Sequence, residues 1–86
     1  MVDLLEVHKE KSLISIDARD AIRKGYHPRQ EILKLVEEAQ APVLCEIHVP
    51  HKTGPLVAAL EAMGLNVTIA QVDVGHFRLR ALKLED

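Results

Sequence analysis

The sequence predicts a small α+β fold, a two-layer sandwich with the order β-α-β-α-β-β. Its 86 residues are enough for one domain with a single core. Stretches with the period-two alternation of strands are separated by two stretches of helical periodicity, each of which begins at a proline. Because β-α-β connections of this length are right-handed, both helices should cover one face of a four-stranded mixed sheet, largely parallel with an antiparallel final strand.

The first predicted strand is Ser12 to Ala18, in which Ile14 and Ile16 alternate with more polar neighbours. A polar loop at residues 19–27 follows, with room for one helical turn at residues 20–23. A strand that leads into a helix places such a loop at one edge of the sheet, where small α/β proteins usually keep their ligand sites. A functional site is therefore expected at that edge.

The N-terminal residues 1–11, MVDLLEVHKEK, leave three structures open. They are a short strand, a frayed helical turn, and an arm packed on another surface. Four aliphatic side chains among the first seven residues favour packing over a disordered tail. We therefore divide the chain into an N-terminal arm, 1–11, and a single domain, 12–86.

The two predicted helices each begin with a proline, which suits the first helical position because its missing N–H has no helical partner there. The first runs from Pro28 to Gln40 and ends before Pro42, since a residue that precedes proline avoids helical geometry. The second begins at Pro55 and ends at Gly64, which is suited to a left-handed helix end. The apolar stripes are Ile32, Leu33, Leu35, Val36 and Ala39 in the first helix, and Leu56, Val57, Leu60 and Met63 in the second.

The second predicted strand, residues 42–50, places Cys45 on the same face as its aliphatic neighbours Val43, Ile47 and Val49. A cysteine beneath the helices is expected to be a small buried hydrophobic residue. A reactive thiol needs an exposed, electropositive setting, which this position does not offer.

The last two predicted strands, residues 66–74 and 77–84, are joined by a tight turn and complete a sheet whose second face carries no helix. On that open face, opposite charges are expected to pair across neighbouring strands. The leucines there would be covered by the N-terminal arm or by a second copy of the chain. The predicted lining of the open face includes Leu13, Leu44, Leu82, Glu46, Arg78 and Arg80.

The composition argues against several classes of protein. A net charge of −2 and a pI near 6.2 do not suit a general nucleic-acid binder, which carries a basic excess on one face. The single cysteine fits a reducing compartment. No apolar run approaches the ~20 residues of a membrane span. We therefore expect a cytoplasmic protein that does not enter a membrane.

Ile16-Asp17-Ala18-Arg19, the loop with Gly25, and the proline-led helix resemble the TusA-like (SirA-like) sulfur-carrier proteins. The β-α-β-α-β-β order and a second helix ending at Gly64 fit the same family, and the resemblance covers roughly residues 13–83. It implies the α+β two-layer fold, a setting near sulfur or redox metabolism, and a protein partner. In that family, a Cys-Pro-x-Pro motif opens the first helix, and its cysteine carries a persulfide.

The sequence departs from this motif where the sulfur chemistry would occur. His27 stands at the position of the cysteine, and Gln30 replaces the second proline. The chain therefore most resembles the TusA-related branch of unknown function that lacks the Cys-Pro motif. The fold is expected to carry over, whereas sulfur transfer is not, because the nucleophile is absent.

Three histidines are candidate metal ligands. His27 opens the first helix, and His48 and His51 flank the end of the second strand, so all three are expected at one edge of the sheet. Neutral imidazole is the commonest metal ligand, and a site needs about three converging groups. A divalent metal at these residues is weighed against their being ordinary loop side chains. His8 and His76 are expected to be exposed and uninvolved.

An anion is the other candidate ligand of that edge. Two helix N-termini would present unpaired N–H groups and positive dipole ends together. Candidate side chains near those ends are Arg19, Arg29, Lys52 and Thr53. The alternatives are that Arg29 and Lys52 are solvated surface charges, and that Asp17 and Arg19 pair to fix the loop.

These observations favour a non-catalytic binding or interaction module rather than an enzyme. The module would act through the edge formed by His27 and the His48–Thr53 loop, and would take a protein partner and a small anion or a metal. One alternative is a sulfur carrier that uses Cys45 or a histidine-bound metal. Another is weak RNA binding through the open sheet face, which two aromatic residues support poorly. A homodimer is also compatible with the open face.

Overall fold

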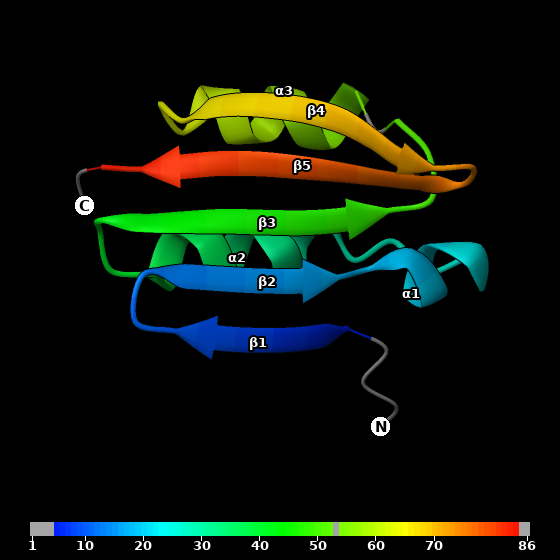
Figure 1. The fold of residues 1–86 in the computed structure, drawn as a ribbon, viewed down its shortest axis with the longest axis horizontal. Helices are drawn as coiled ribbons and strands as arrows, with labels where there is room; N and C mark the ends of the chain where they lie inside the picture. The colour runs from blue at the N-terminus through cyan, green and yellow to red at the C-terminus, as the bar shows by residue number, and fades with distance from the viewer. Residues whose placement is uncertain (1–4, 53, 85–86) are drawn as a thin grey trace.

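The structure, a computed structural model, describes residues 5–52 and 54–84. Within them, one mixed sheet has the strand order β1-β2-β3-β5-β4 (Figure 1). The strands are β1 (Glu6–Glu10), β2 (Leu13–Asp17), β3 (Val43–Val49), β4 (Asn66–Asp73) and β5 (His76–Lys83). The helices are α1 (Arg19–Arg23), α2 (Arg29–Glu38) and α3 (Gly54–Ala62).

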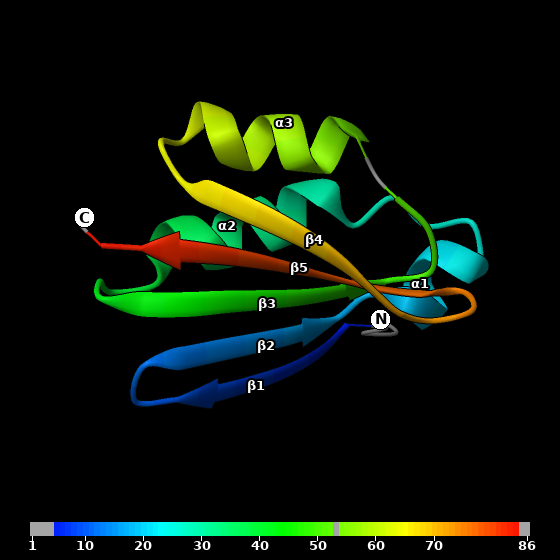
Figure 2. The ribbon, with the colours of Figure 1, turned by 45° about the horizontal axis from the view of Figure 1, so that its top comes forward.

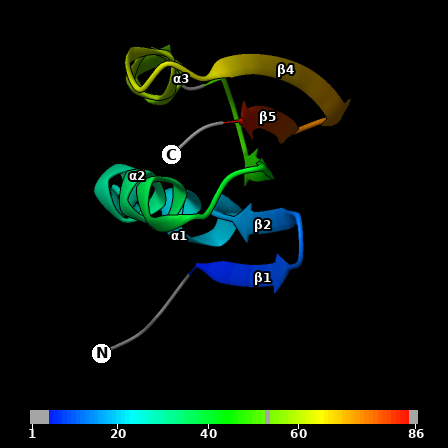
Figure 3. The same cartoon turned by 90° about the vertical axis from the view of Figure 1, so that its left-hand side faces the viewer.

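The two-layer arrangement is as predicted. Figures 2 and 3 show α2 and α3 on the same face of the sheet, and the short α1 follows β2 at one end of it. The core lies between these helices and the sheet. Its fully buried side chains include Ile16, Ile32, Val36, Ile47, Val49, Leu60 and Leu79. Among the described residues, no helix combines the length and apolar character needed to cross a membrane.

The sheet has five strands, so the prediction of four was wrong. The additional strand, β1, pairs antiparallel with β2 and places Val7 opposite Ile16. It lies within the N-terminal segment for which three structures were left open; residues 1–4 of that segment are outside the described residues. Only Val7 among the five β1 residues packs against the core. One inward-facing apolar residue is too short a pattern to identify a strand.

The sheet is less parallel than predicted. Of the strands in the described part of the chain, only β2 and β3 pair in parallel, because β5 lies between β3 and β4 and is antiparallel to both. The hairpin after α3 therefore folds back toward the centre of the sheet. As a result, β4 and not β5 forms the second edge (Figure 1).

Among the described residues, no helix or loop covers the face of the sheet away from the helices, as predicted (Figure 3). Arg80 lies directly opposite Glu46, and its Nε atom is 3.5 Å from the Glu46 Oε1 atom, so the expected cross-strand ion pair is present. Leu13, Leu44 and Leu82 form a row across β2, β3 and β5. β1 does not cover this row, because it extends the sheet beside β2.

Lys83 closes the C-terminal end of α2. Although it lies in β5, it is only 8% exposed, and its ammonium group donates to the carbonyls of Val36, Glu37 and Ala39 at 3.2, 2.9 and 2.7 Å. The last carbonyls of a helix have no partners within it, and a cation is favoured at this end of the helix dipole. Lys83 thus joins the sheet to the helix layer.

Candidate functional site

A pocket of about 610 Å³ lies beside the N-terminal ends of α2 and α3. It is lined by residues of the α1–α2 loop, the first turn of α2, the β3–α3 loop and the start of α3. Its described lining is Ile22, Tyr26, His27, Pro28, Arg29, Gln30, Glu31, Ile32, His51, Lys52, Pro55 and Leu56. The two loops that precede the proline-led segments are therefore neighbours in space, as predicted.

The loop between α1 and α2 brings His27 to this pocket. Gly25 adopts a φ of 89°, a left-handed conformation that costs glycine little. The N–H of Tyr26 then donates to the Ala21 carbonyl at 3.0 Å, which folds the loop back onto α1. The chain leaves this turn at His27 and enters α2 directly after Pro28.

The N-terminal end of α2 has no side-chain cap among the described residues. Pro28 occupies the cap position, one residue earlier than the first helical position predicted for it, and its carbonyl accepts the first helical bond from the N–H of Ile32 at 3.0 Å. The N–H groups of Arg29, Gln30 and Glu31 precede that bond. Such groups are available to a ligand, and the helix dipole makes this end electropositive.

The charged side chains of the pocket are mostly cationic. Arg29 is the first residue of α2, Lys52 belongs to the β3–α3 loop, and Glu31 is the single carboxylate in the described lining. All three side chains are exposed. The pocket therefore combines positive side chains with positive helix ends, and its floor includes the buried apolar residues Ile32 and Leu56.

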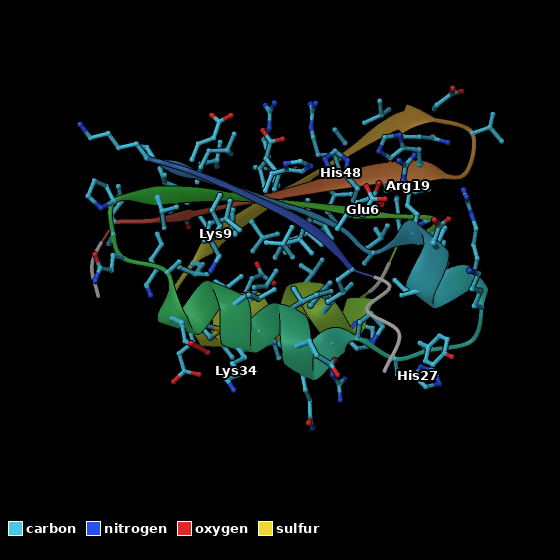
Figure 4. The ribbon with its side chains drawn as sticks, turned by 90° about the horizontal axis from the view of Figure 1, so that it is seen from below. Glu6, Lys9, Arg19, His27, Lys34 and His48 are labelled. Atoms are coloured by element: carbon cyan, nitrogen blue, oxygen red, sulfur yellow. The ribbon has the colours of Figure 1, made fainter. Side chains whose placement is uncertain are left out.

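The structure divides the predicted site residues into two groups. His27, Arg29, His51 and Lys52 line the pocket. Arg19 and His48 lie on the opposite side of the sheet from His27 (Figure 4). Thr53 lies outside the described residues.

His48 faces away from the helices because it alternates along β3 with two fully buried residues, Ile47 and Val49. The three imidazoles of the predicted metal site, His27, His48 and His51, are therefore not brought together, and a metal held by all three does not fit this arrangement. Within residues 5–52 and 54–84, no group of three or more His, Cys, Asp or Glu side chains is placed to hold a metal ion.

On the open face, His48 pairs with His76. The Nδ1 atom of His48 is 2.8 Å from the Nε2 atom of His76, so one ring donates a hydrogen bond and the other accepts it. The ring centroids are 5.0 Å apart. Burial, followed by the neighbouring His76, lowers the pKa of His48 below 6.5 and favours the neutral ring.

His76 was expected to be exposed and uninvolved, but it is partly buried in this contact. The last strand was predicted to begin at Phe77, but β5 begins at His76, and alternation along β5 places His76 on the same face as Arg78. The missing information was the register, which sets Arg78 opposite His48 and so brings His76 one step further along the open face. A register between strands distant in sequence is not encoded in the alternation of either one.

Asp17 and Arg19 form the predicted ion pair. The Nε and Nη2 atoms of Arg19 donate to the two carboxylate oxygens at 3.0 and 2.8 Å, and its backbone N–H donates to Oδ1 at 3.1 Å. These bonds from Arg19 lower the pKa of Asp17 and keep it ionised. Arg19 therefore stabilises the junction between β2 and α1, and its side chain does not point toward the pocket.

Cys45 is fully buried beneath the helices, as the strand pattern predicted. Burial raises the pKa of its thiol, which disfavours the reactive thiolate. Its environment is that of a core residue.

Comparisons of the chain with protein-family models, with curated proteins and with solved structures gave no match. The resemblance to the TusA-like proteins therefore stays a prediction from the sequence.

Proposed function

We propose that this protein is a non-catalytic binding module that takes a small anion in the pocket between the N-terminal ends of α2 and α3. One observation carries the proposal: two helix N-termini open onto the same pocket, with Arg29 and Lys52 on its walls. Unpaired N–H groups and the positive ends of helix dipoles favour an anion, and two such ends add their fields at one place.

The size and lining of the pocket support a small organic anion rather than a bare ion. A volume of about 610 Å³ lies within the usual range of small-molecule sites. The aliphatic side chains of Ile22, Ile32 and Leu56 offer contact to an apolar portion, and the cationic groups offer contact to a carboxylate or phosphate. The chain contains no glycine-rich phosphate loop, so a nucleotide is not proposed.

Binding without turnover is supported by the chemistry of the described lining. It contains no serine, threonine or cysteine that a neighbouring histidine would activate as a nucleophile. We further propose a cytoplasmic protein that presents the loaded pocket to a protein partner, consistent with the resemblance to TusA-like proteins.

The alternatives are less well supported by the described contacts. Sulfur transfer through Cys45 would need its buried thiol to become accessible. RNA binding through the open face would lack aromatic stacking platforms, and the face carries Glu46 and Asp17.

Isothermal titration with inorganic phosphate and with phenyl phosphate tests the proposal. We expect both to bind, phenyl phosphate more tightly, because its ring contacts the aliphatic floor. The double substitution Arg29→Gln with Lys52→Gln should weaken binding by about tenfold or more, since each lost cation contributes a charge-assisted contact.

The double substitution Lys9→Gln with Lys34→Gln is the matched control, because both lysines are exposed and lie outside the pocket lining. It changes the net charge by two units, as the site variant does, without removing a cation from the site. Equal affinity losses in the two double variants would indicate non-specific attraction and would contradict the proposed site.

A further inference from the structure

The side chains of the pocket that can donate to an anion lie on two separate walls. His27 and Arg29 belong to the α1–α2 loop and the first turn of α2, and we call them the α2 wall. His51 and Lys52 belong to the β3–α3 loop, and we call them the α3 wall. Each wall thus presents one imidazole and one cation beside the N-terminal end of a helix. Imidazole N–H groups and both cations are donors to a carboxylate or phosphate.

The floor between the two walls is apolar. Ile32 of α2 and Leu56 of α3 line the pocket and belong to the same buried core cluster, so the apolar surface continues from one wall to the other. α2 and α3 are neighbours in the helix layer, and packed helices have axes about 8–10 Å apart. A carboxylate bound at one helix end is therefore separated from the other end by several ångströms of apolar floor.

The charge of the pocket suits two acidic groups better than one. Arg29 and Lys52 outnumber Glu31, the single carboxylate of the described lining, by one positive charge when the imidazoles are counted as neutral. Each helix N-terminus adds the equivalent of about half a unit charge, so the pocket carries about two positive charges. A dianion would neutralise this charge, whereas a monoanion would leave half of it unpaired.

We propose that the ligand of this pocket is a small dianion whose two acidic groups are joined by a short apolar chain. One acidic group accepts hydrogen bonds from the α2 wall, and the other accepts them from the α3 wall. The chain between them lies over Ile32 and Leu56. A dicarboxylate belongs to this class. This proposal rests on the proposed function, because it names the class of small anion that the pocket takes.

Isothermal titration at pH 7.5 with adipate, hexanoate and succinate tests the class of ligand. Adipate and hexanoate have the same number of carbons and differ by one carboxylate, whereas succinate has the charge of adipate on a shorter chain. We expect adipate to bind at least about fivefold more tightly than either, because only adipate has two carboxylates that reach both walls. A smaller advantage over either ligand would contradict a dianion that spans the pocket.

Single substitutions test whether the two cations contact different acidic groups. Arg29→Gln and Lys52→Gln should each weaken adipate binding by about fivefold or more, because one carboxylate loses a charge-assisted contact. Hexanoate can use the wall that stays intact, so each variant should weaken its binding by only about twofold. Lys9→Gln and Lys34→Gln each remove an exposed lysine outside the pocket lining, and they should leave the ratio of adipate to hexanoate affinity unchanged.

Two different failures of this experiment have different meanings. If Arg29→Gln and Lys52→Gln weaken adipate and hexanoate binding by the same factor, the two cations share one acidic group, and the dianion is wrong although an anion site remains. If the wild-type chain binds none of these ligands and no phenyl phosphate, the anion site itself is wrong. Circular dichroism should show that all four variants are folded, because the substituted residues are exposed.

Discussion

Lys83 shows how one side chain holds the two layers of this protein together. Its ammonium group is buried and bonds three carbonyls at the end of α2. Strand alternation indicates that it shares a face with Leu79 and Ala81. Its partners belong to a helix that ends more than forty residues earlier in the chain, so the sequence pattern alone did not identify them.

Replacing Lys83 with methionine should destabilise the fold by about 1–3 kcal/mol, because the helix carbonyls would remain buried without their donor. The control is Lys34→Met, an exposed position on α2 where a change within about 0.5 kcal/mol is expected. Urea unfolding measures both free energies. Equal stabilities of the two variants would contradict the role given to Lys83.

The lowered pKa of His48 makes the stability of the fold depend on pH. The unfolded chain, with a pKa near 6.5, takes up the proton more readily than the folded one. Neutral His48 therefore makes its full contribution to the free energy of unfolding above pH 6.5. This contribution is lost as the pH falls below 6.5 toward the pKa of His48 in the folded state.

Measurement of the unfolding free energy between pH 5 and pH 8 checks this prediction for His48→Gln. The variant should lose less stability than the wild type on acidification. His8→Gln, which removes an exposed histidine from β1, should keep the wild-type slope. Parallel curves for His48→Gln and the wild type would be incompatible with the burial of a neutral ring.

Two predictions for single residues succeeded because the pattern that determines them is local in sequence. The pairing of Asp17 with Arg19 and the burial of Cys45 both follow from neighbours within a few positions. The grouping of His48 with His27 did not succeed. The end of a strand determines which edge of the sheet a residue approaches, but the alternation along the strand decides which face it occupies, and His48 lies on the open one.

At the scale of elements, the sequence identified each segment with a long apolar pattern. Proline-led helices and the alternating strands β2, β3, β4 and β5 appear within a few residues of their predicted bounds. A strand was one of three structures left open for residues 1–11, because the pattern of β1 contains only one inward-facing apolar residue. α1 was foreseen only as one turn at residues 20–23 within a loop.

The α1–α2 loop depends on the left-handed conformation of Gly25. Gly25→Ala should cost about 1 kcal/mol, because an L-residue at this φ is strained although no atom lies within 4 Å of the added Cβ. Gly54→Ala is the control, since Gly54 lies in α3 with open space around it and alanine favours helix. Thermal unfolding should rank Gly25→Ala below the wild type and Gly54→Ala at or above it; the reverse order would exclude strain at residue 25.

At the scale of the whole molecule, the fold separates two surfaces. The cationic pocket lies on the helix side, and the open face holds the Asp17–Arg19 and His48–His76 pairs. The predicted order of elements was sufficient to place the two helices on one face and the two loops together. The order of elements did not predict that β5 lies inside the sheet. The position of the β4–β5 hairpin depends on tertiary packing and not on the alternation of apolar and polar residues within its two strands.

The central claim, that two helix N-termini hold a small anion, is tested most directly by two-dimensional NMR of the labelled chain during titration with phenyl phosphate. We expect saturable shifts at the backbone amides of Arg29, Gln30, Glu31 and Leu56, which line the pocket, with amides of the β1 edge unmoved. The N–H groups themselves would be the ligands, so their signals should respond first. Shifts spread over unrelated surface amides, or none at α2 and α3, would contradict it.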